Sequence, residues 1–152
     1  MSTAPRPSAA RREPGREPGR KSDRRQAVGV LGERVAARWL ERGGWEILAR
    51  RFRSGHRDLD LVARLGTLVA FVEVKARRGL AFGDPIEAVR WRKQRELVRS
   101  ANVWIDRHGR AGDAYRFDVV GVVLPPAQAG AGEGPAVRVR HVADAFQVPS
   151  RA

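Results

Sequence analysis

Two stretches of the chain carry hydrophobic residues every three or four positions, a spacing that predicts two amphipathic helices. In the first stretch the repeating residues are Val28, Leu31, Val35 and Trp39. Asp23 is a candidate N-cap, and Gly43-Gly44 can end the helix because glycine readily adopts the left-handed conformation that follows helices. We therefore expect the first helix over residues 24–42.

The second helix is expected over residues 85–106, where Asp84 is a candidate N-cap and Pro85 suits the first helical position. Its inward stripe would contain Ile86, Val89, Lys93, Leu97, Ala101 and Trp104. A lysine on that stripe has two explanations. Either the Lys93 side chain extends past the edge of the core into water, or it points at an anionic group at the end of the sheet.

Shorter apolar segments predict five strands, over residues 45–49, 59–64, 68–76, 115–124 and 136–142. A turn at residues 65–67 would join the second and third strands as a hairpin, and the last strand alternates as an edge strand does. Residues 50–57 and 77–83 are polar and basic, and we expect loops there. The order of elements predicts an α/β fold, a mixed β-sheet with the helices on one or both faces.

The N-terminal residues 1–22 consist mostly of Pro, Gly, Ser, Ala, Arg and Glu, which predicts a disordered basic tail before a single domain at residues 23–148. No apolar run approaches the roughly 18–20 residues of a membrane span, and the N-terminus lacks the apolar segment of a secretory signal. The chain has no cysteine, which excludes disulfides and thiolate metal sites. We expect a cytoplasmic protein that does not bind membranes.

Basic residues are in excess over the whole chain. Lys and Arg total 30 against 17 Asp and Glu, a net charge of +13, and residues after 25 still carry +8 of it. A basic folded domain is typical of proteins that bind nucleic acid, and DNA is the expected partner. The alternative is an arginine-rich proteome, which would give basic surfaces without any ligand.

Candidate chemistry lies on the predicted hairpin. Residues i and i+2 of a strand point to the same face, so Glu73 projects with Lys75 and Asp58 with Asp60. Paired strands would bring carboxylates together beside one ammonium. Such a group can hold Mg²⁺ or Mn²⁺ and orient a water for phosphodiester hydrolysis, with Asp60 and Glu73 as metal ligands.

Each of these residues also has an ordinary structural explanation. Glu73 and Lys75 could form an ion pair on a half-exposed strand, which is worth only about 0–1 kcal/mol. The apolar setting argues against this, because an unpaired buried charge is costly. Glu33 could add a third carboxylate from the first helix, although its helical position alone favours a solvated glutamate.

Four segments together resemble the YraN-like family of small bacterial proteins, in order and in spacing. They are Gly29-Val-Leu-Gly-Glu33, Asp58-Leu-Asp-Leu-Val62, Phe71-Val-Glu-Val-Lys-Ala-Arg77 and Arg116-Phe-Asp-Val-Val120. That family is assigned to the PD-(D/E)XK nuclease-like fold and is similar to archaeal Holliday-junction resolvases. The resemblance covers about residues 26–124 and implies a restriction-endonuclease-like core. Because resolvases cut two strands and are often dimers, it also implies a homodimer as a candidate assembly.

The resemblance assigns roles residue by residue. Asp60 matches the catalytic aspartate, Glu73 and Lys75 match the E-x-K pair, and Glu33 matches the helix-one glutamate. Lys93 matches a lysine common on the second helix, which favours its inward orientation.

Two other positions of the resemblance concern structure. Arg116 and Asp118 match an R-F-D element that we interpret as structural support. The chain departs from the family where Arg57 and Asp58 replace a usual Gly-Glu pair.

The leading hypothesis is a metal-dependent endonuclease that acts on branched DNA and recognises its shape rather than its sequence. The candidate nucleic-acid-binding residues are Arg53, Arg77, Arg78 and Lys93. A non-catalytic nucleic-acid-binding protein with the same fold is the first alternative. The second is a scaffold protein whose acidic partner mimics nucleic acid.

Overall fold

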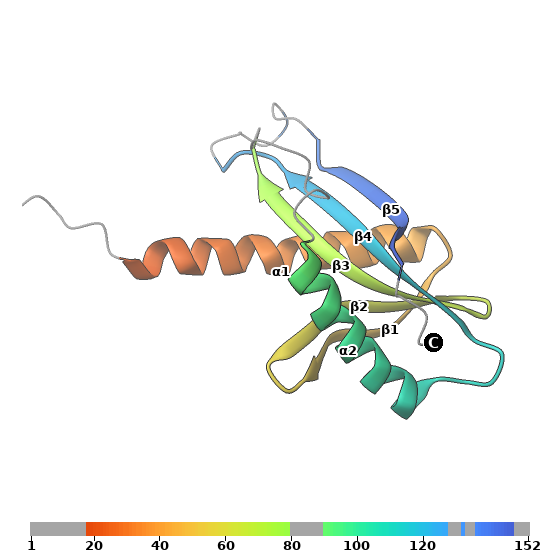
Figure 1. Cartoon of the computed structure of the whole chain (residues 1–152). Helices are drawn as coiled ribbons and strands as arrows, with labels where there is room; N and C mark the ends of the chain where they lie inside the picture. Colours follow the sequence, from red (N-terminus) through yellow and green to blue (C-terminus); the bar gives the residue numbers. More distant parts are fainter. Residues whose placement is uncertain (1–17, 80–89, 128–131, 133–135, 148–152) are drawn as a thin grey trace, which may run out of the picture.

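The chain folds around one five-stranded sheet with a helix on each side (Figure 1). The structure is a computed structural model and describes residues 18–79, 90–127, 132 and 136–147. Its elements are α1 (Pro18–Arg42), β1 (Glu46–Ser54), β2 (Arg57–Leu65), β3 (Leu68–Arg78), α2 (Trp91–His108), β4 (Ala114–Leu124) and β5 (Arg138–Phe146).

The sheet is mixed, and its strands follow chain order from β1 to β5. All neighbours pair antiparallel except β3 and β4, which are parallel. Parallel pairing needs a crossover connection, and the segment containing α2 supplies it. The predicted α/β fold class, with a mixed restriction-endonuclease-like sheet flanked by helices, is confirmed, as is the β2–β3 hairpin.

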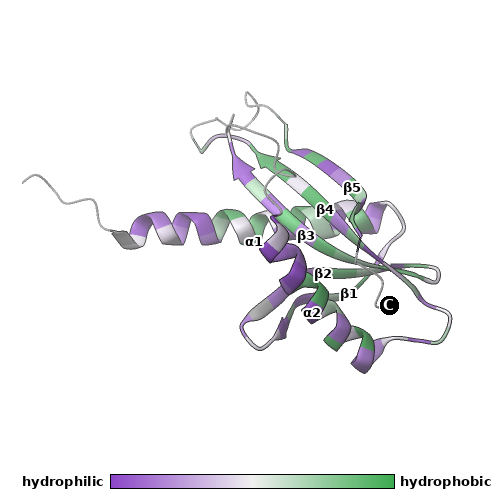
Figure 2. Ribbon diagram, in the orientation of Figure 1, coloured by the Kyte–Doolittle hydropathy of each residue, from purple (hydrophilic) through white to green (hydrophobic). Residues whose placement is uncertain are grey.

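Each face of the sheet packs against one helix, so the core has two parts. On one face Ala36 and Leu40 of α1 pack against small and branched residues of β2, β3 and β4. On the other face Leu97, Ala101 and Trp104 of α2 pack against the aromatic side chains of the sheet. The apolar colour of the central strands is visible in Figure 2. A carboxylate on β3 or β4 is therefore surrounded by core.

Helix α1 begins earlier than the sequence predicts. It starts at Pro18, so Asp23 is an interior helical residue and not its N-cap, and residues 18–22 are not part of a disordered tail. Residues 19–27 of this helix are exposed, and its first half projects beyond the sheet as a polar rod (Figures 1 and 2). Arg, Lys, Gln and Ala are good helix formers, which explains a helix there without tertiary contacts. Residues 1–17 lie outside the described part of the chain.

The predicted loop at residues 50–57 is wrong, because β1 continues to Ser54. Phe52 pairs with Leu59 of β2 and packs on the core, so cross-strand bonding outweighs the polar composition. Strand β3 likewise extends to Arg78, into the second predicted loop. The predicted N-cap of the second helix and residues 85–89 lie outside the described residues, within which α2 begins at Trp91. No helix in the described ranges is long and apolar enough to cross a membrane.

The inward face of α1 is made of smaller residues than the periodicity suggests. Leu31 and Trp39 are 37% and 40% exposed, whereas Ala36 and Leu40 are fully buried. Gly32 lies so close to Ala76 of β3 that a Cβ on this glycine would overlap the alanine side chain. The approach of α1 to the central strand therefore depends on the absence of a side chain at this position.

We expect Gly32→Ala to lower the free energy of unfolding by about 1–3 kcal/mol, because the helix or the strand must shift to admit a methyl group. Gly29→Ala is the matched control, since a Cβ there meets no atom within 4 Å. That control should raise stability by up to about 1 kcal/mol through helix propensity. Urea unfolding of both variants measures the difference. Equal stabilities would contradict the close contact.

Candidate active site

Strand β3 presents Glu73 and Lys75 on the face of the sheet that α2 covers. Val69 and Phe71 lie in the α2-side core, and alternation along the strand continues that face through Glu73 and Lys75. Glu73 is buried, with 4% of its side chain exposed, and its Oε1 lies 3.2 Å from Lys75 Nζ. The ion pair is thus largely removed from water on the carboxylate side, unlike a pair on a half-exposed strand.

The start of α2 adds a second cation to this carboxylate. Lys93 Nζ lies 3.6 Å from the same Glu73 Oε1. Of the two orientations open to Lys93, the structure has the one directed at an anion of the sheet. This ion pair with the sheet explains why a lysine interrupts the apolar stripe of α2, which continues with Leu97, Ala101 and Trp104.

Asp60 lies on the same face as Val62, which packs in the α2-side core, and next to an irregularity in β2. Leu59 packs in the α2-side core and Leu61 in the α1-side core, although residues two apart in a regular strand share a face. The β2–β3 ladder reaches only to Leu61, which pairs with Val72. Beyond it the Asp60 carboxylate accepts a hydrogen bond from the Val74 N–H, at 2.7 Å. A side chain thus takes the place of a backbone acceptor at the point where the strands separate.

The pKa of Asp60 is raised, as expected for a buried carboxyl group next to another carboxylate. Burial, followed by the charge of Glu73, raises the pKa of Asp60 from 3.8 to about 7, against the opposing hydrogen bond from Val74 N–H. Glu33 raises this pKa further through its charge. The two carboxylates of β2 and β3 are therefore close enough to disfavour simultaneous ionisation, as paired carboxylates are in acid–base and metal sites.

One oxygen of Glu73 is not held by a cation. Both lysines contact Oε1, whereas Oε2 is buried and no lysine, arginine or backbone N–H of the described residues donates to it. The Asp60 carboxyl shares a hydrogen bond with Glu73, which is one cause of its raised pKa, so a proton on Asp60 takes the place of a cation there. Together the two carboxyl groups are a suitable donor set for a hard divalent cation, since Mg²⁺ often takes only one or two protein carboxylates.

Glu33 joins the site indirectly. Arg51 Nε lies 2.7 Å from Glu33 Oε2, so the helix-one glutamate is held by an arginine of β1. Arg51 adopts a positive φ of 49°, an uncommon conformation for a residue with a side chain, and this follows the irregularity opposite in β2. Within the described residues no group of three or more Asp, Glu or His side chains could hold a metal. Asp60 and Glu73 are thus brought together. Glu33 is instead paired with Arg51, and it acts on Asp60 only through its charge.

The predicted nucleic-acid-binding arginines occupy separate positions. Arg53 on β1 forms an ion pair with Asp58 at 3.4 Å and is 79% exposed. Arg78 at the end of β3 donates to the Pro125 carbonyl at 3.0 Å, and Arg77 is engaged in an interaction of its own. Lys93 belongs to the carboxylate site. A phosphate-binding role for these four residues stays a prediction.

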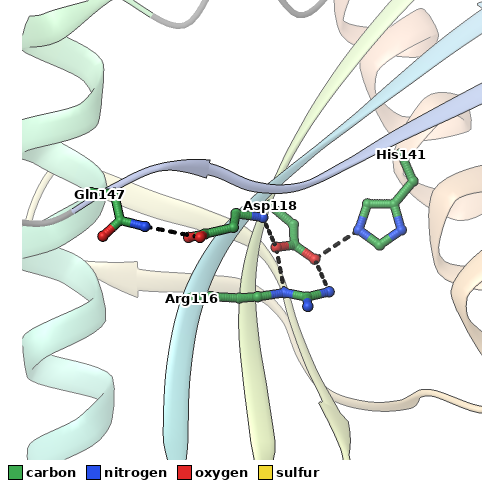
Figure 3. Close-up of polar contacts among 5 residues, drawn as sticks. Arg116, Asp118, His141 and Gln147 are labelled. Atoms are coloured by element: carbon green, nitrogen blue, oxygen red, sulfur yellow. Dashed lines mark hydrogen bonds and ion pairs between the residues drawn. The ribbon is translucent and has the colours of Figure 1, made fainter.

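The opposite face of the sheet holds a second buried carboxylate, Asp118, in a network that sequence analysis only partly identified (Figure 3). Arg116 donates to both carboxylate oxygens, and His141 Nε2 lies 2.7 Å from Oδ2. The Asp144 N–H donates to Oδ1 at 3.0 Å. Burial alone would raise the pKa of Asp118, but the bonds from His141, Arg116 and Asp144 outweigh it and lower that pKa. The R-F-D element is therefore satisfied internally, and His141 was the partner without a sequence signal.

We expect the metal-free protein to lose stability as the pH rises from about 4 to about 7. The unfolded chain releases the Asp60 proton near its ordinary pKa of 3.8, whereas the folded chain holds it to about 7. The full difference corresponds to at most about 4 kcal/mol. Asp60→Asn keeps an acceptor for Val74 N–H and should remove most of this dependence. Urea unfolding in EDTA at about pH 4.5 and about pH 8 measures it.

Asp58→Asn is the control for that experiment, because Asp58 is 41% exposed and forms an ion pair with Arg53 at the surface. Its variant should keep the pH dependence of the parent. A stability difference between Asp60→Asn and the parent that is the same at both pH values would contradict a raised pKa.

Comparison with known proteins identifies the family. Residues 32–122 match the family described as "Uncharacterised protein family UPF0102". A "UPF0102 protein" of Rhodococcus jostii is 43% identical over 120 residues, which cover 79% of this chain and 96% of the relative. One from Chloroherpeton thalassium is 40% identical, covering 80% and 94%, and one from Beutenbergia cavernae is 48% identical, covering 65% and 84%. The matched region includes both carboxylates and both lysines of the site, and the chain belongs to the UPF0102, or YraN, family.

Proposed function

We propose that this protein is a divalent-metal-dependent endonuclease that hydrolyses phosphodiester bonds in DNA, with a preference for branched structures. The observation that carries the proposal is the buried Glu73 carboxylate, which has one oxygen on two lysines and shares a hydrogen bond with an Asp60 carboxyl of raised pKa. A structural ion pair does not require a second, protonated carboxyl beside it. A site in which a cation replaces that proton does.

Asp60 and Glu73 would hold the cation, Mg²⁺ or Mn²⁺. When bound there, such an ion supplies a Lewis acid that neutralises charge on the scissile phosphate and lowers the pKa of a bound water. Binding would displace the Asp60 proton, because a ligating carboxylate must be ionised. A bound cation would also relieve the repulsion between the two ionised carboxylates, and this relief would contribute to metal affinity.

Lys75 would act on the reacting atoms. Its side chain is 31% exposed, so Nζ reaches both Glu73 and solvent. From there the ammonium can donate a hydrogen bond to an attacking water and stabilise the negative charge that develops on the phosphate. Lys93 adds positive charge from α2, while Glu33 with Arg51 acts at longer range on Asp60.

DNA as the substrate is supported by the charge of the chain and by the resemblance to junction resolvases. The net charge of +13 favours a polyanion, and arginines line β1 and the end of β3 near the carboxylates. We propose that the protein recognises the shape of the DNA and the positions of its phosphates rather than its base sequence.

A nucleic-acid-binding protein without turnover is the second candidate. It is favoured by the ion pair that holds Glu33 to Arg51, and by the grouping of only two carboxylates within the described residues. The two functions differ in what the carboxylates do. In the nuclease they bind metal and support cleavage, and in the binding protein they are dispensable.

We expect the protein to bind Mn²⁺ with release of close to one proton near pH 6, because Asp60 must ionise on binding. Calorimetry in two buffers of different ionisation enthalpy measures both affinity and proton release. Asp60→Asn and Glu73→Gln should each lower affinity at least about tenfold. Glu41→Gln is the control, since Glu41 lies on the surface of α1 with 49% exposure. Equal affinity in all four proteins would contradict the assigned ligands.

We expect cleavage of a labelled four-way junction or flap in Mn²⁺, with a weaker reaction on plain duplex. Glu73→Gln and Lys75→Ala should each reduce the rate by about 10²-fold or more, as loss of a metal ligand or of a positioned charge does. Lys21→Ala is the matched lysine control, exposed on the projecting half of α1.

Three results of that assay have distinct meanings. Cleavage that both variants lose and the control keeps supports the nuclease. No cleavage by any protein, with equal DNA binding, supports the binding protein. Cleavage that persists in Glu73→Gln would contradict the proposed site.

A further inference from the structure

The outer side of α2 carries an aromatic and basic surface that the carboxylate site does not use. Trp91, Arg92, Arg95 and Arg99, which we call the tryptophan–arginine face, line a hollow that is open to solvent, and Glu96 lines it with them. Trp91 is 64% exposed, more than any other large hydrophobic side chain in the described residues. An exposed tryptophan beside three cations requires an explanation other than packing.

The helix geometry gathers these side chains on one surface. Trp91, Arg95 and Arg99 follow one another at intervals of four residues, and Arg92 flanks them one residue from Trp91. The buried residues Leu97, Ala101 and Trp104 lie on the other side of the helix. Four residues advance about 6 Å along a helix, a step similar to that between successive phosphates of an extended single strand.

The arginines of this face differ from others in the protein. Arg64 and Arg116 each hold a carboxylate through two nitrogen atoms, and Arg51 holds one through an ion pair. Arg92, Arg95 and Arg99 have no hydrogen bond or ion pair with any other residue in the described ranges. Three guanidinium groups on one helix face, none of them paired with another described residue, are complementary to a chain of anions.

We propose that the tryptophan–arginine face binds an unpaired, single-stranded segment of nucleic acid. Its phosphates would lie along Arg92, Arg95 and Arg99, and a base would stack on the indole of Trp91. Bases inside a duplex already stack on one another and cannot offer a free face, so the tryptophan selects an unpaired base. Stacking on an aromatic side chain is a general feature of single-strand recognition and tolerates any sequence.

The location of the face connects it to the carboxylate site. Lys93, two residues from Trp91 in the same helical turn, reaches Glu73 from the inner side of α2. A strand held on the outer side at Trp91 therefore passes the end of the helix next to the carboxylates. Resting on the proposed nuclease function, this assigns the substrate class as DNA with a single-stranded arm or gap.

The face can be tested by binding alone, in EDTA, without any cleavage. Fluorescence anisotropy with a labelled oligothymidine and with a blunt duplex compares the parent with Trp91→Ala and with the double variant Arg95→Ala/Arg99→Ala. Trp91→Ala should weaken single-strand binding by about 5- to 150-fold, the range measured for loss of one stacked base. Duplex affinity should change by less than about twofold. Trp91→Phe should retain most of the single-strand affinity.

The double arginine variant should lower the salt dependence as well as the affinity. Loss of two phosphate contacts on a single strand reduces the slope of log K against log salt by about 1.4. Arg34→Ala/Arg38→Ala is the matched control, an exposed pair at the same spacing on α1. Trp39→Ala is the tryptophan control, 40% exposed on α1. Both controls should bind as the parent does, and thermal denaturation verifies that all variants are folded.

The outcomes separate this proposal from the nuclease proposal. Weak single-strand binding in Trp91→Ala supports the face, even where the parent cleaves nothing and the nuclease proposal fails. Unchanged binding in folded Trp91→Ala overturns the face, even where the parent cleaves DNA. Equal losses on duplex and single strand, or equal losses in the α1 controls, would also overturn it.

Discussion

A carboxylate buried in the middle of a sheet must be neutralised by its neighbours, and Glu73 imposes that requirement on three elements at once. Strand β3 supplies Lys75, helix α2 supplies Lys93, and strand β2 brings a second carboxyl, Asp60. Removing a charge from water costs several kcal/mol unless geometry and hydrogen bonds compensate it. The raised pKa of Asp60 shows that the compensation is incomplete, since one more negative charge is not tolerated without a proton. This local imbalance distinguishes the α2 face from the rest of the core.

Asp118 provides the comparison within the same protein. It is fully buried on the α1 face, yet its two oxygens accept hydrogen bonds from a guanidinium, an imidazole and a backbone N–H. Its pKa is lowered although burial acts to raise it. Two carboxylates in one sheet thus have opposite environments. A structural role explains Asp118, whose charge is fully compensated, whereas the Asp60–Glu73 pair holds a proton that a cation could replace.

Much of the fold was predictable because its signals are local. Hydrophobic alternation and a short turn specified the β2–β3 hairpin, and i, i+2 spacing placed Glu73 with Lys75 on one face. The contacts that depend on irregular backbone were not predictable. Arg51 with its positive φ lies in a segment whose polar composition suggested a loop, and its bond to Glu33 crosses from β1 to α1. The reversal of facing between Leu59 and Leu61, beside Asp60, has no periodic signal either.

Distant partners were missed for a related reason. An aspartate such as Asp118 in an apolar strand indicates that a partner must neutralise it. Nothing in the sequence identifies that partner as His141, 23 residues away on β5. The small residues that bring α1 against β3 were similarly hidden, because periodicity weights large side chains such as Trp39. Sequence spacing therefore identified the charged residues of the candidate site, whereas the partners that orient their side chains are visible only in the tertiary structure.

The two outer strands also determine how the sheet ends. β1 and β5 are the edges, and each contains one non-glycine residue with positive φ, Arg51 and Asp144. Each also has a register shift in its ladder, and arginines recur along both. Kinked, cationic edges are poor templates for a strand from another molecule. A chain whose central strands are rich in valine and leucine is thereby protected, at its borders, against the edge-to-edge pairing that leads to fibrils.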